Sequence, residues 1–485
     1  MEKPSYTLLD DFELKGLWWL PEQPDSQISG TISFENEKKI SLDLLGSFHE
    51  VRTFGSGDFF QPDIILGVTD NGQVCTLFRN FETRNQLNSS SIQKSIIESQ
   101  YLFIGKHFNT PDDICFSSFQ ANFTNLENWL TKRPFSMEIP EDIKAGEWKL
   151  THKWPEEFIS KIEVLNSTIE STHEFKADGD LIRNATWKSK AYLKITPENK
   201  EHFKWFWRVI YDLCNFFTLL IGDTTYIVRM KGYGDDIEIS PGQKTKETIE
   251  VFFTQKKPGM NDGIHPFEMI IPFPRISDKI EKVMSLWFSK SQTLRSVYDL
   301  FFGTFYNPGM YLQFHFLSLT QAIESYHRVT KGGKYLSDES WQPFRKSLAD
   351  QIPVELDSGH RESLKSRIKY GNEYSLRKRL GELLCTIDEK SLSVLFPSKN
   401  FLTGTVVDTR NYLTHYDDEL KDSSLKGADL YWANQRLRIF LTLLLLKEIE
   451  IDENVILASM KENNKISQVF NKRHSAEPSA SLDAK

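Results

Sequence analysis

The feature that most constrains the fold is a change of periodicity near Pro308. Before this residue, short runs of alternating apolar and polar residues are separated by Gly, Pro and Asn, a pattern typical of strands joined by turns. After it, apolar residues recur at steps of three and four, which indicates amphipathic helices. The sequence therefore predicts an α+β multidomain protein, with a β-rich N-terminal region containing embedded helices and an all-α C-terminal bundle.

A chain of 485 residues is long enough for more than one domain, each with its own core. Polar and small residues dominate the C-terminal end, a composition typical of disorder. The domains that we expect are a β-rich domain over 1–180, an α+β second part over 181–307, a helical domain over 308–466 and a disordered tail over 467–485.

Shorter patterns predict individual elements of the N-terminal region. Asn71-Gly72 predicts a tight hairpin turn between two strands. An apolar stripe predicts a helix from Pro197 to Leu220, and a second helix is expected from about Asp278 to Phe302. We also expect a strand at Phe267–Ile271. Gly232-Tyr233-Gly234 is predicted to be a turn, because its glycines do not open a helix as those of a phosphate-binding loop would.

Composition narrows the functional class. The formal net charge of -8 argues against a protein that coats nucleic acid non-specifically, although a nuclease with a local basic patch is still allowed. The four cysteines lie far apart, which disfavours a zinc cluster or a disulfide scaffold, and we expect no metal and no cofactor. The N-terminus has no apolar signal core, and the longest apolar run, Ile439–Leu446, is too short to span a bilayer. A cytoplasmic protein without membrane contact is expected.

The segment from Phe401 to Tyr416 is predicted to be helical, with two unlike faces. One face forms an apolar stripe predicted to be buried, made of Leu402, Val406, Thr409, Leu413 and Tyr416. The other face, rotated by about 200° at about 100° per residue, consists of Gly404, Asp408, Asn411 and His415. Solvated helix faces usually carry Glu, Lys, Arg or Gln, since Gly, Asp and Asn are poor helix formers. The second face is therefore unusual.

Arg410 lies next to Asn411, and its long side chain can extend towards His415. An imidazole can move a proton to or from the attacking ribose hydroxyl or the leaving oxygen during RNA cleavage. A guanidinium can stabilise the charge that grows on the phosphate. The pair thus suits RNA cleavage that requires no metal, although a capped helix end with a surface histidine has the same pattern.

The run Arg410-Asn411-Tyr412-Leu413-Thr414-His415 resembles the Arg-φ-x3-His signature of the HEPN ribonuclease superfamily, in which the φ position is often a polar residue such as Asn. Its setting is similar too, because a strongly apolar helix is expected from Leu430 to Ile449. The N-terminal region resembles Apea-type phage-defence proteins, which join a β-rich region to a C-terminal HEPN domain. The segments that carry this resemblance are Phe12–Pro21, Ile28–Ile32 and Leu42–Gly46.

The resemblance implies a metal-independent endoribonuclease of an abortive-infection system, which cleaves RNA and leaves a cyclic phosphate. Arg410 would stabilise the phosphate, Asn411 would position it or the histidine, and His415 would be the acid/base. The resemblance also implies a homodimer through the HEPN domain, with Gly404 and Asn411 permitting close approach. The N-terminal region would sense a trigger such as a phage component.

Two further features are candidates for the site. Basic residues outnumber acids between positions 361 and 379, where tyrosines are interleaved, a composition that suits RNA binding but also a solvated helix face. The candidate RNA-binding residues are Arg361, Lys365, Arg367, Lys369, Arg377, Lys378 and Arg379. Glu324 lies on the first helix of the C-terminal domain, where HEPN families often place an acid that could orient the Arg or the His. The alternative is an ordinary helix-face Glu that pairs with Arg328 at i+4.

Other functions remain open from sequence alone. One is a non-catalytic HEPN domain that binds nucleotides, RNA or a protein. Another is a toxin controlled by modification of a tyrosine two residues after the histidine, but here Tyr416 follows His415 directly and Asp417 holds that second place.

Overall fold

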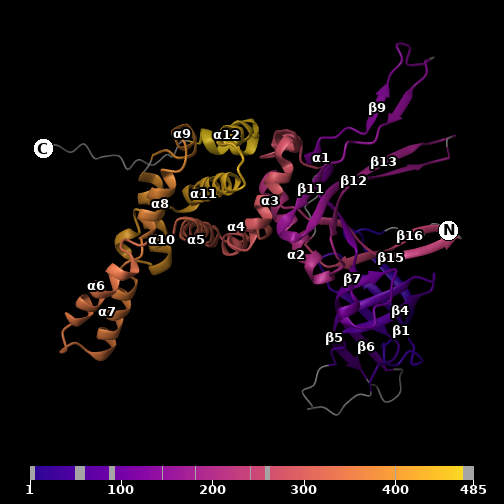
Figure 1. The fold of residues 1–485 in the computed structure, drawn as a ribbon, viewed down its shortest axis with the longest axis horizontal. Coiled ribbons are helices and arrows are strands. Elements are labelled where there is room, and N and C mark those ends of the chain that lie inside the picture. Colours follow the sequence, from indigo (N-terminus) through magenta and orange to yellow (C-terminus); the bar gives the residue numbers. More distant parts are fainter. Residues whose placement is uncertain are drawn as a thin grey trace. The chain divides into compact units, whose positions relative to one another are not determined.

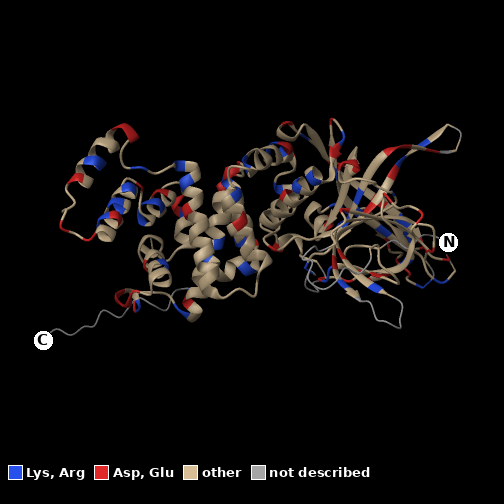
Figure 2. Cartoon of the chain, turned by 90° about the horizontal axis from the view of Figure 1, so that it is seen from below, with Lys and Arg blue, Asp and Glu red and all other residues tan. Residues whose placement is uncertain are grey.

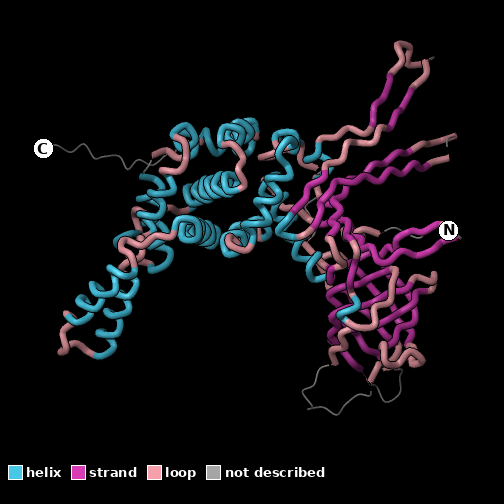
Figure 3. Tube along the Cα trace, in the orientation of Figure 1, coloured by secondary structure: helices cyan, strands magenta, loops and turns pink. Residues whose placement is uncertain are grey.

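The computed structural model describes residues 6–49, 60–86, 93–144, 146–180, 182–240, 242–256, 263–398 and 400–472. The chain forms two compact units, Met1–Phe288 and Ser289–Lys485, called here the N-terminal and C-terminal units. The first is rich in strands and the second is helical (Figure 3), which confirms the predicted fold class.

Six strands of the N-terminal unit close into a barrel, because β6 pairs with β5 as well as with β3. The strands are β1 (Phe12–Trp19), β2 (Ile28–Phe34), β3 (Ile40–Leu44), β4 (Ile64–Thr69), β5 (Val74–Gln86) and β6 (Lys94–Ile104). Alternate residues point inward, so Trp18, Ile32 and Leu42 are completely buried. The predicted turn at Asn71-Gly72 joins β4 to β5 with Gly72 at a φ of +78°, as a tight hairpin turn requires.

The sheet continues beyond β6 as an open extension in the order β16, β15, β8, β13, β12, β11 (Figure 1). These strands are β8 (Ser118–Phe123), β11 (Ile159–Ile162), β12 (Ser167–Asp178), β13 (Thr186–Pro197), β15 (Ile227–Ser240) and β16 (Gln243–Phe253). Shorter elements complete the unit: η1 (Pro111–Asp113), β7 (Cys115–Phe116), α1 (Leu126–Leu130), β9 (Phe135–Glu138), β10 (Lys149–His152), η2 (Glu163–Leu165), β14 (Glu201–His202), η3 (Pro266–Glu268), η4 (Phe273–Arg275) and η5 (Ser277–Lys279).

Helix α2 (Phe203–Ile221) packs on this sheet through the aromatic stripe that the sequence predicted. The ring of Phe203 lies 5.2 Å from that of Phe103 on β6, and Phe206 lies 4.8 Å from Phe119 on β8. The helix begins later than expected, because His202 caps its N-terminus by accepting the Lys204 N–H. Pro197, the expected start, is instead the last residue of β13, and Glu201–His202 form β14.

Three predictions for the N-terminal region are wrong. Gly232–Gly234 lies inside β15 and not in a turn. Gly232 has a packing role in this strand, because a Cβ at this position would lie 2.4 Å from the Phe116 ring. Phe267–Ile271 contains the turn η3 in place of a strand, and Ile271 N–H donates to Leu220 O at the end of α2. The expected helix from Asp278 to Phe302 is two helices, α3 (Ile280–Ser291) and α4 (Arg295–Tyr306). The boundary between the two units falls at Phe288, close to this interruption.

The C-terminal unit is built around α5 (Leu312–Lys331) and α11 (Gly427–Glu448), which pack against each other. Residues Ile439–Leu446 are buried on every face of α11, which explains the longest apolar run of the sequence as a core helix. The remaining elements are α8 (Leu376–Leu384), α9 (Glu389–Leu395), η6 (Phe401–Thr405), α10 (Val406–His415), η7 (Asp418–Leu420), α12 (Glu453–Glu462) and α13 (Asn464–Asn471).

Two further helices, α6 (Asp338–Asp350) and α7 (Ser358–Tyr370), pack against each other and project from the other helices of this unit (Figure 1). We call this pair the arm. Its two ends are joined by a short antiparallel stem, in which Tyr335 N–H donates to Asn372 O at 2.9 Å and Tyr374 N–H donates to Gly333 O at 2.9 Å. The stem fixes where the arm leaves α5 and enters α8.

The helix α13 continues to Asn471, so residues 467–471 are not the disordered tail that the sequence predicted; residues 473–485 lie outside the described part of the chain. Within the described residues, no helix is both long and apolar enough to cross a bilayer.

Candidate active site

The predicted motif helix begins as a π-helical turn. In η6 the Val406 N–H bonds to Phe401 O, five residues back, and α10 follows directly. Gly404 is buried inside this turn, and a Cβ there would lie 2.6 Å from Asn400 Oδ1. A side chain at this position would have to displace the Asn400 side chain. Gly404 is not exposed for contact with a second copy, contrary to what its position on the polar face predicted.

The apolar stripe of the motif helix is only partly buried. Leu402, Val406 and Thr409 are buried as predicted, whereas Leu413 is half-buried and Tyr416 is exposed. Tyr416 leaves the stripe because the helix ends at His415 and Tyr416 adopts a φ of +53°. Thr409 Oγ1 donates to Thr405 O at 2.7 Å and accepts the Leu425 N–H at 3.0 Å, which fastens the following loop to α10.

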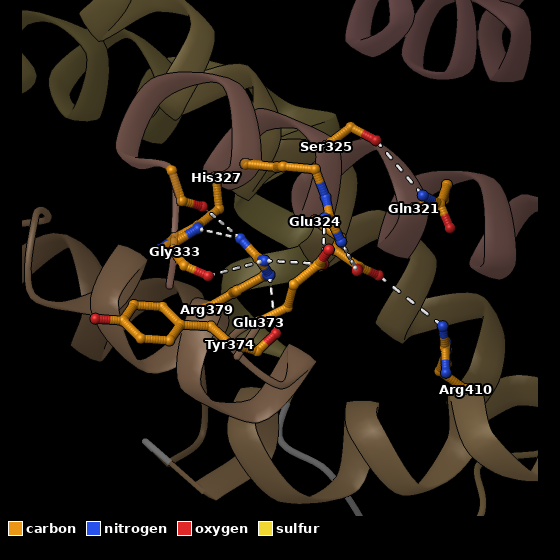
Figure 4. A network of polar contacts seen from close by, with 11 residues as sticks. Gln321, Glu324, Ser325, His327, Gly333, Glu373, Tyr374, Arg379 and Arg410 are labelled. Carbon is orange, nitrogen blue, oxygen red and sulfur yellow. Dashed lines mark hydrogen bonds and ion pairs between the residues drawn. The ribbon is translucent and has the colours of Figure 1, made fainter. Parts of the chain in front are cut away.

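Arg410 is held in place by two polar neighbours. Its Nη1 donates to Asn411 Oδ1 at 3.2 Å. Its Nη2 lies 3.9 Å from Glu324 Oε2 on α5 (Figure 4). The Glu324 side chain is 16% exposed and that of Arg410 is 31% exposed, so the pair is partly shielded from water. Glu324 also pairs with Arg328 at 3.2 Å, the i+4 partner considered for it from the sequence.

His415 lies on the same helix, five residues after Arg410, and is exposed. Among the described residues, no hydrogen bond or ion pair engages its ring. A histidine in this state can exchange protons with a bound molecule without first breaking a contact. The structure therefore places a guanidinium with two polar partners and an unengaged imidazole on one helix.

Two family models match the chain. A model described as ApeA N-terminal domain 1 matches residues 13–287, more than half of the sequence, and a model described as Apea-like HEPN matches residues 317–455. The chain belongs to the ApeA-like HEPN proteins of phage-defence systems. The resemblance inferred from the sequence is confirmed. No curated protein and no solved structure matches the chain closely enough to add to this.

HEPN domains are generally of the ribonuclease type, so the family indicates an RNA-related function in defence. The matched HEPN region contains Glu324, Arg410, Asn411 and His415 as well as the whole arm. Among the described residues, no group of three or more His, Cys, Asp or Glu side chains is placed to hold a metal ion.

The predicted basic segment of the HEPN domain is divided between two helices. Lys and Arg are interspersed with acids along the arm (Figure 2). On α7, Arg367 and Lys369 are exposed, while Arg361 and Lys365 are half-buried. On α8, Arg377 is exposed and pairs with Asp408 of the motif helix at 3.2 Å, and Lys378 pairs with Glu382 at 3.4 Å. The α7 residues form one group on the arm, and Arg377 is brought beside α10.

Arg379 is a correction to the predicted RNA-binding set, because its side chain is only 1% exposed. Its guanidinium donates to Gly332 O at 2.6 Å, to Tyr374 O at 3.1 Å and to His327 Nδ1 at 3.1 Å. Burial lowers the pKa of Arg379 from its ordinary value. Arg379 therefore holds the arm's stem against α5 and cannot contact RNA in this conformation.

The buried partner of Arg379 is a residue that was not predicted from the sequence. His327 is completely buried on α5, and its Nε2 lies 2.8 Å from Glu382 Oε2. Because a guanidinium can only donate, Nδ1 of His327 must accept from Arg379, and Nε2 must then carry the proton that bonds Glu382. The sequence signal was available, since His327 follows Ile323 by four residues in the apolar stripe of α5.

Proposed function

We propose that the HEPN domain is a metal-independent endoribonuclease of an abortive-infection system, acting on RNA in the cytoplasm. His415 moves the proton to or from the reacting oxygen, and Arg410 stabilises the charge on the phosphate. Asn411 and Glu324 hold Arg410 in place. The observation that carries the proposal is the contrast on α10, where Arg410 has two polar partners and His415 is exposed and, among the described residues, unengaged.

The test is RNA cleavage by the purified chain and by single variants, with chelator present. His415→Ala should slow cleavage by about 100- to 10,000-fold, the usual contribution of a general acid/base. Because neither side chain is in the core, stability should change by at most about 1 kcal/mol in His415→Ala and Arg410→Ala. Arg410→Lys should also be slow, since an ammonium cannot offer two parallel donors.

His360, an exposed histidine at the start of α7, provides the matched control, and His360→Ala should cleave at the wild-type rate. Equal cleavage by His415→Ala and wild type would show that the assignment is wrong, and would leave a non-catalytic binding module as the alternative. Loss of cleavage on adding chelator would show that the chemistry depends on a metal.

We further propose that the active species is a homodimer through the HEPN domain. The exposed end of α10, with His415 and with Tyr416 70% exposed, is available for a second chain. Light scattering should show a dimer, and the activity per chain should fall on dilution below its dissociation constant. An active monomer by light scattering would contradict this.

The N-terminal unit is proposed to bind the trigger, such as a phage component. Support comes from the strand pair β9–β10, where the cross-strand partners Met137 and Leu150 are 59% and 44% exposed. A two-stranded ribbon with an exposed apolar face is a typical contact surface. Met137→Lys with Leu150→Lys should abolish protection against phage while leaving cleavage by the purified protein intact. Undiminished protection would place the trigger site elsewhere.

A further inference from the structure

The Glu324 carboxylate is shared between two guanidinium groups. One oxygen lies 3.2 Å from Arg328 Nη2, and the other lies 3.9 Å from Arg410 Nη2 (Figure 4). The contact with Arg328 is the shorter one. Any change that strengthens the hold of Arg328 on Glu324 will therefore draw the carboxylate away from Arg410.

Arg328 is itself shared, because its Nη1 makes a close ion pair with Glu373 Oε2. The hydrogen bond to Glu373 is the largest cause that raises the pKa of Arg328, ahead of the contact with Glu324. Arg328 is 49% exposed, and exposed ion pairs add little to stability. Glu373 therefore acts mainly by orienting the Arg328 side chain and contributes little to stability.

Glu373 lies in the stem of the arm. Its backbone bridges Lys334 on the opposite side of the stem, and its neighbour Tyr374 bonds Gly333. Arg379 also holds the stem in place, because its guanidinium donates to Gly332 O and Tyr374 O. The same guanidinium lies 3.8 Å from Glu373 Oε2. The position of the Glu373 carboxylate therefore follows the position of the stem.

We propose that Glu373 and Arg328 are positioning residues for Arg410. Glu373 holds Arg328 and leaves one oxygen of Glu324 available to Arg410. When the stem moves, Glu373 moves with it, Arg328 turns to Glu324, and Arg410 loses its partner. RNA engaged by the arm thereby acts on the placement of Arg410. This inference rests on the proposed ribonuclease function, since Arg410 is its phosphate-stabilising group.

The kinetic test uses Glu373→Gln, Arg328→Gln and the double variant in the full chain. Glu373→Gln should lower kcat by about tenfold, a coupling within the usual 0.5–2 kcal/mol range, with KM unchanged. Adding Arg328→Gln should restore kcat towards the wild-type value, because no competitor for Glu324 is left. A merely structural role predicts the opposite, since a second lesion in the same cluster would lower activity further.

Glu339→Gln is the matched control. Glu339 is an exposed acid in the first turn of α6, and among the described residues it pairs neither with Arg328 nor with the stem. This variant should keep the wild-type kcat. An unchanged kcat in Glu373→Gln, or an equal loss in Glu339→Gln, would overturn the proposal.

A second measurement does not depend on cleavage. Glu373 and Arg410 are not in contact, so their effects on the unfolding midpoint should add if the network does not link them. We expect the midpoint shift of Glu373→Gln with Arg410→Gln to differ from the sum of the single shifts. Additive shifts would contradict the inference even if the chain proves to be a nuclease. Conversely, a non-additive cycle together with a fully active His415→Ala would reject the proposed chemistry and retain the coupling.

Discussion

Arg377 and Arg379 are two residues apart in the basic segment, but the structure predicts opposite consequences for their replacement. In Arg379→Met the side chain keeps its length, while His327 Nδ1 loses its donor inside the core and Tyr374 O loses its donor in a half-buried position. A buried acceptor without a partner costs about 1–3 kcal/mol, and a half-buried one about 1 kcal/mol, the low end of this range. Gly332 is exposed, so its carbonyl can bind water and adds little. The expected loss is therefore about 2–4 kcal/mol.

Calorimetry of the full chain measures this loss. For a unit of this size about 1 kcal/mol lowers the melting temperature by about 2–4 °C, so Arg379→Met should lower the transition of the C-terminal unit by roughly 4–16 °C. Arg377→Met is the matched control, because Arg377 is 53% exposed and its ion pair with Asp408 is at the surface. Its effect should stay within about 0.5 kcal/mol. Equal shifts for the two variants would falsify the assignment of Arg379 to the core.

Two further predictions follow from the C-terminal unit. Replacing Arg361, Lys365 and Lys369 with Gln should weaken RNA binding and reduce the slope of log affinity against log salt by about 2. The control replaces Lys390, Lys461 and Lys465 with Gln and should change neither the affinity nor the slope. Equal effects in the two triple variants would mean that RNA binding responds only to the net charge of the chain. For Glu453, burial would raise the pKa of the carboxyl, but the hydrogen bonds from Lys447, Ser391 and the Asp388 N–H outweigh burial and lower this pKa from 4.5. A group whose pKa is lowered in the folded state stabilises the fold at a pH above its unfolded-state pKa, and this stabilisation is lost as the pH falls. The difference in melting temperature between wild type and Glu453→Gln should therefore be full above about pH 5 and shrink below about pH 4. A difference that stays constant with pH would refute this prediction.

The division between strands and helices could be predicted from the sequence, because it depends on local periodicity and turn chemistry. Asn71-Gly72 needs only its own φ preference to predict a hairpin turn, and Gly72 adopts the expected positive φ. The aromatic stripe of α2 similarly reports which side of one helix is buried. Both signals lie within a few residues of the element that they specify.

The errors concern residues whose conformation depends on distant neighbours. Gly232 is a glycine because the Phe116 ring occupies the space of its Cβ, and nothing near Gly232 in the sequence reveals that neighbour. Gly404 differs from its prediction in another way, because it is buried inside a π-helical turn and not exposed on the polar face. The pattern of apolar and polar residues predicted a regular helix and did not indicate this turn.

The contacts of Arg379 were not predicted for a different reason. Arg379 was assigned to a basic surface by its charge alone, and its position in the helical repeat was not considered. Arg379 follows Leu376 by three residues and precedes Leu383 by four, so it lies in the buried stripe of α8. His327 lies in the buried stripe of α5 in the same way. A polar residue in phase with an apolar stripe must find a partner inside, since an unpaired buried group is costly. These two residues bond each other. Glu373 lies in the stem between the arm and α8 and not in a helix, so helical periodicity says nothing about its burial, and only the structure shows that it contacts Arg328 and Arg379. Helical periodicity could therefore have predicted that His327 and Arg379 are buried. The contacts that lead from Glu373 through Arg328 and Glu324 to Arg410 could be found only from the three-dimensional structure.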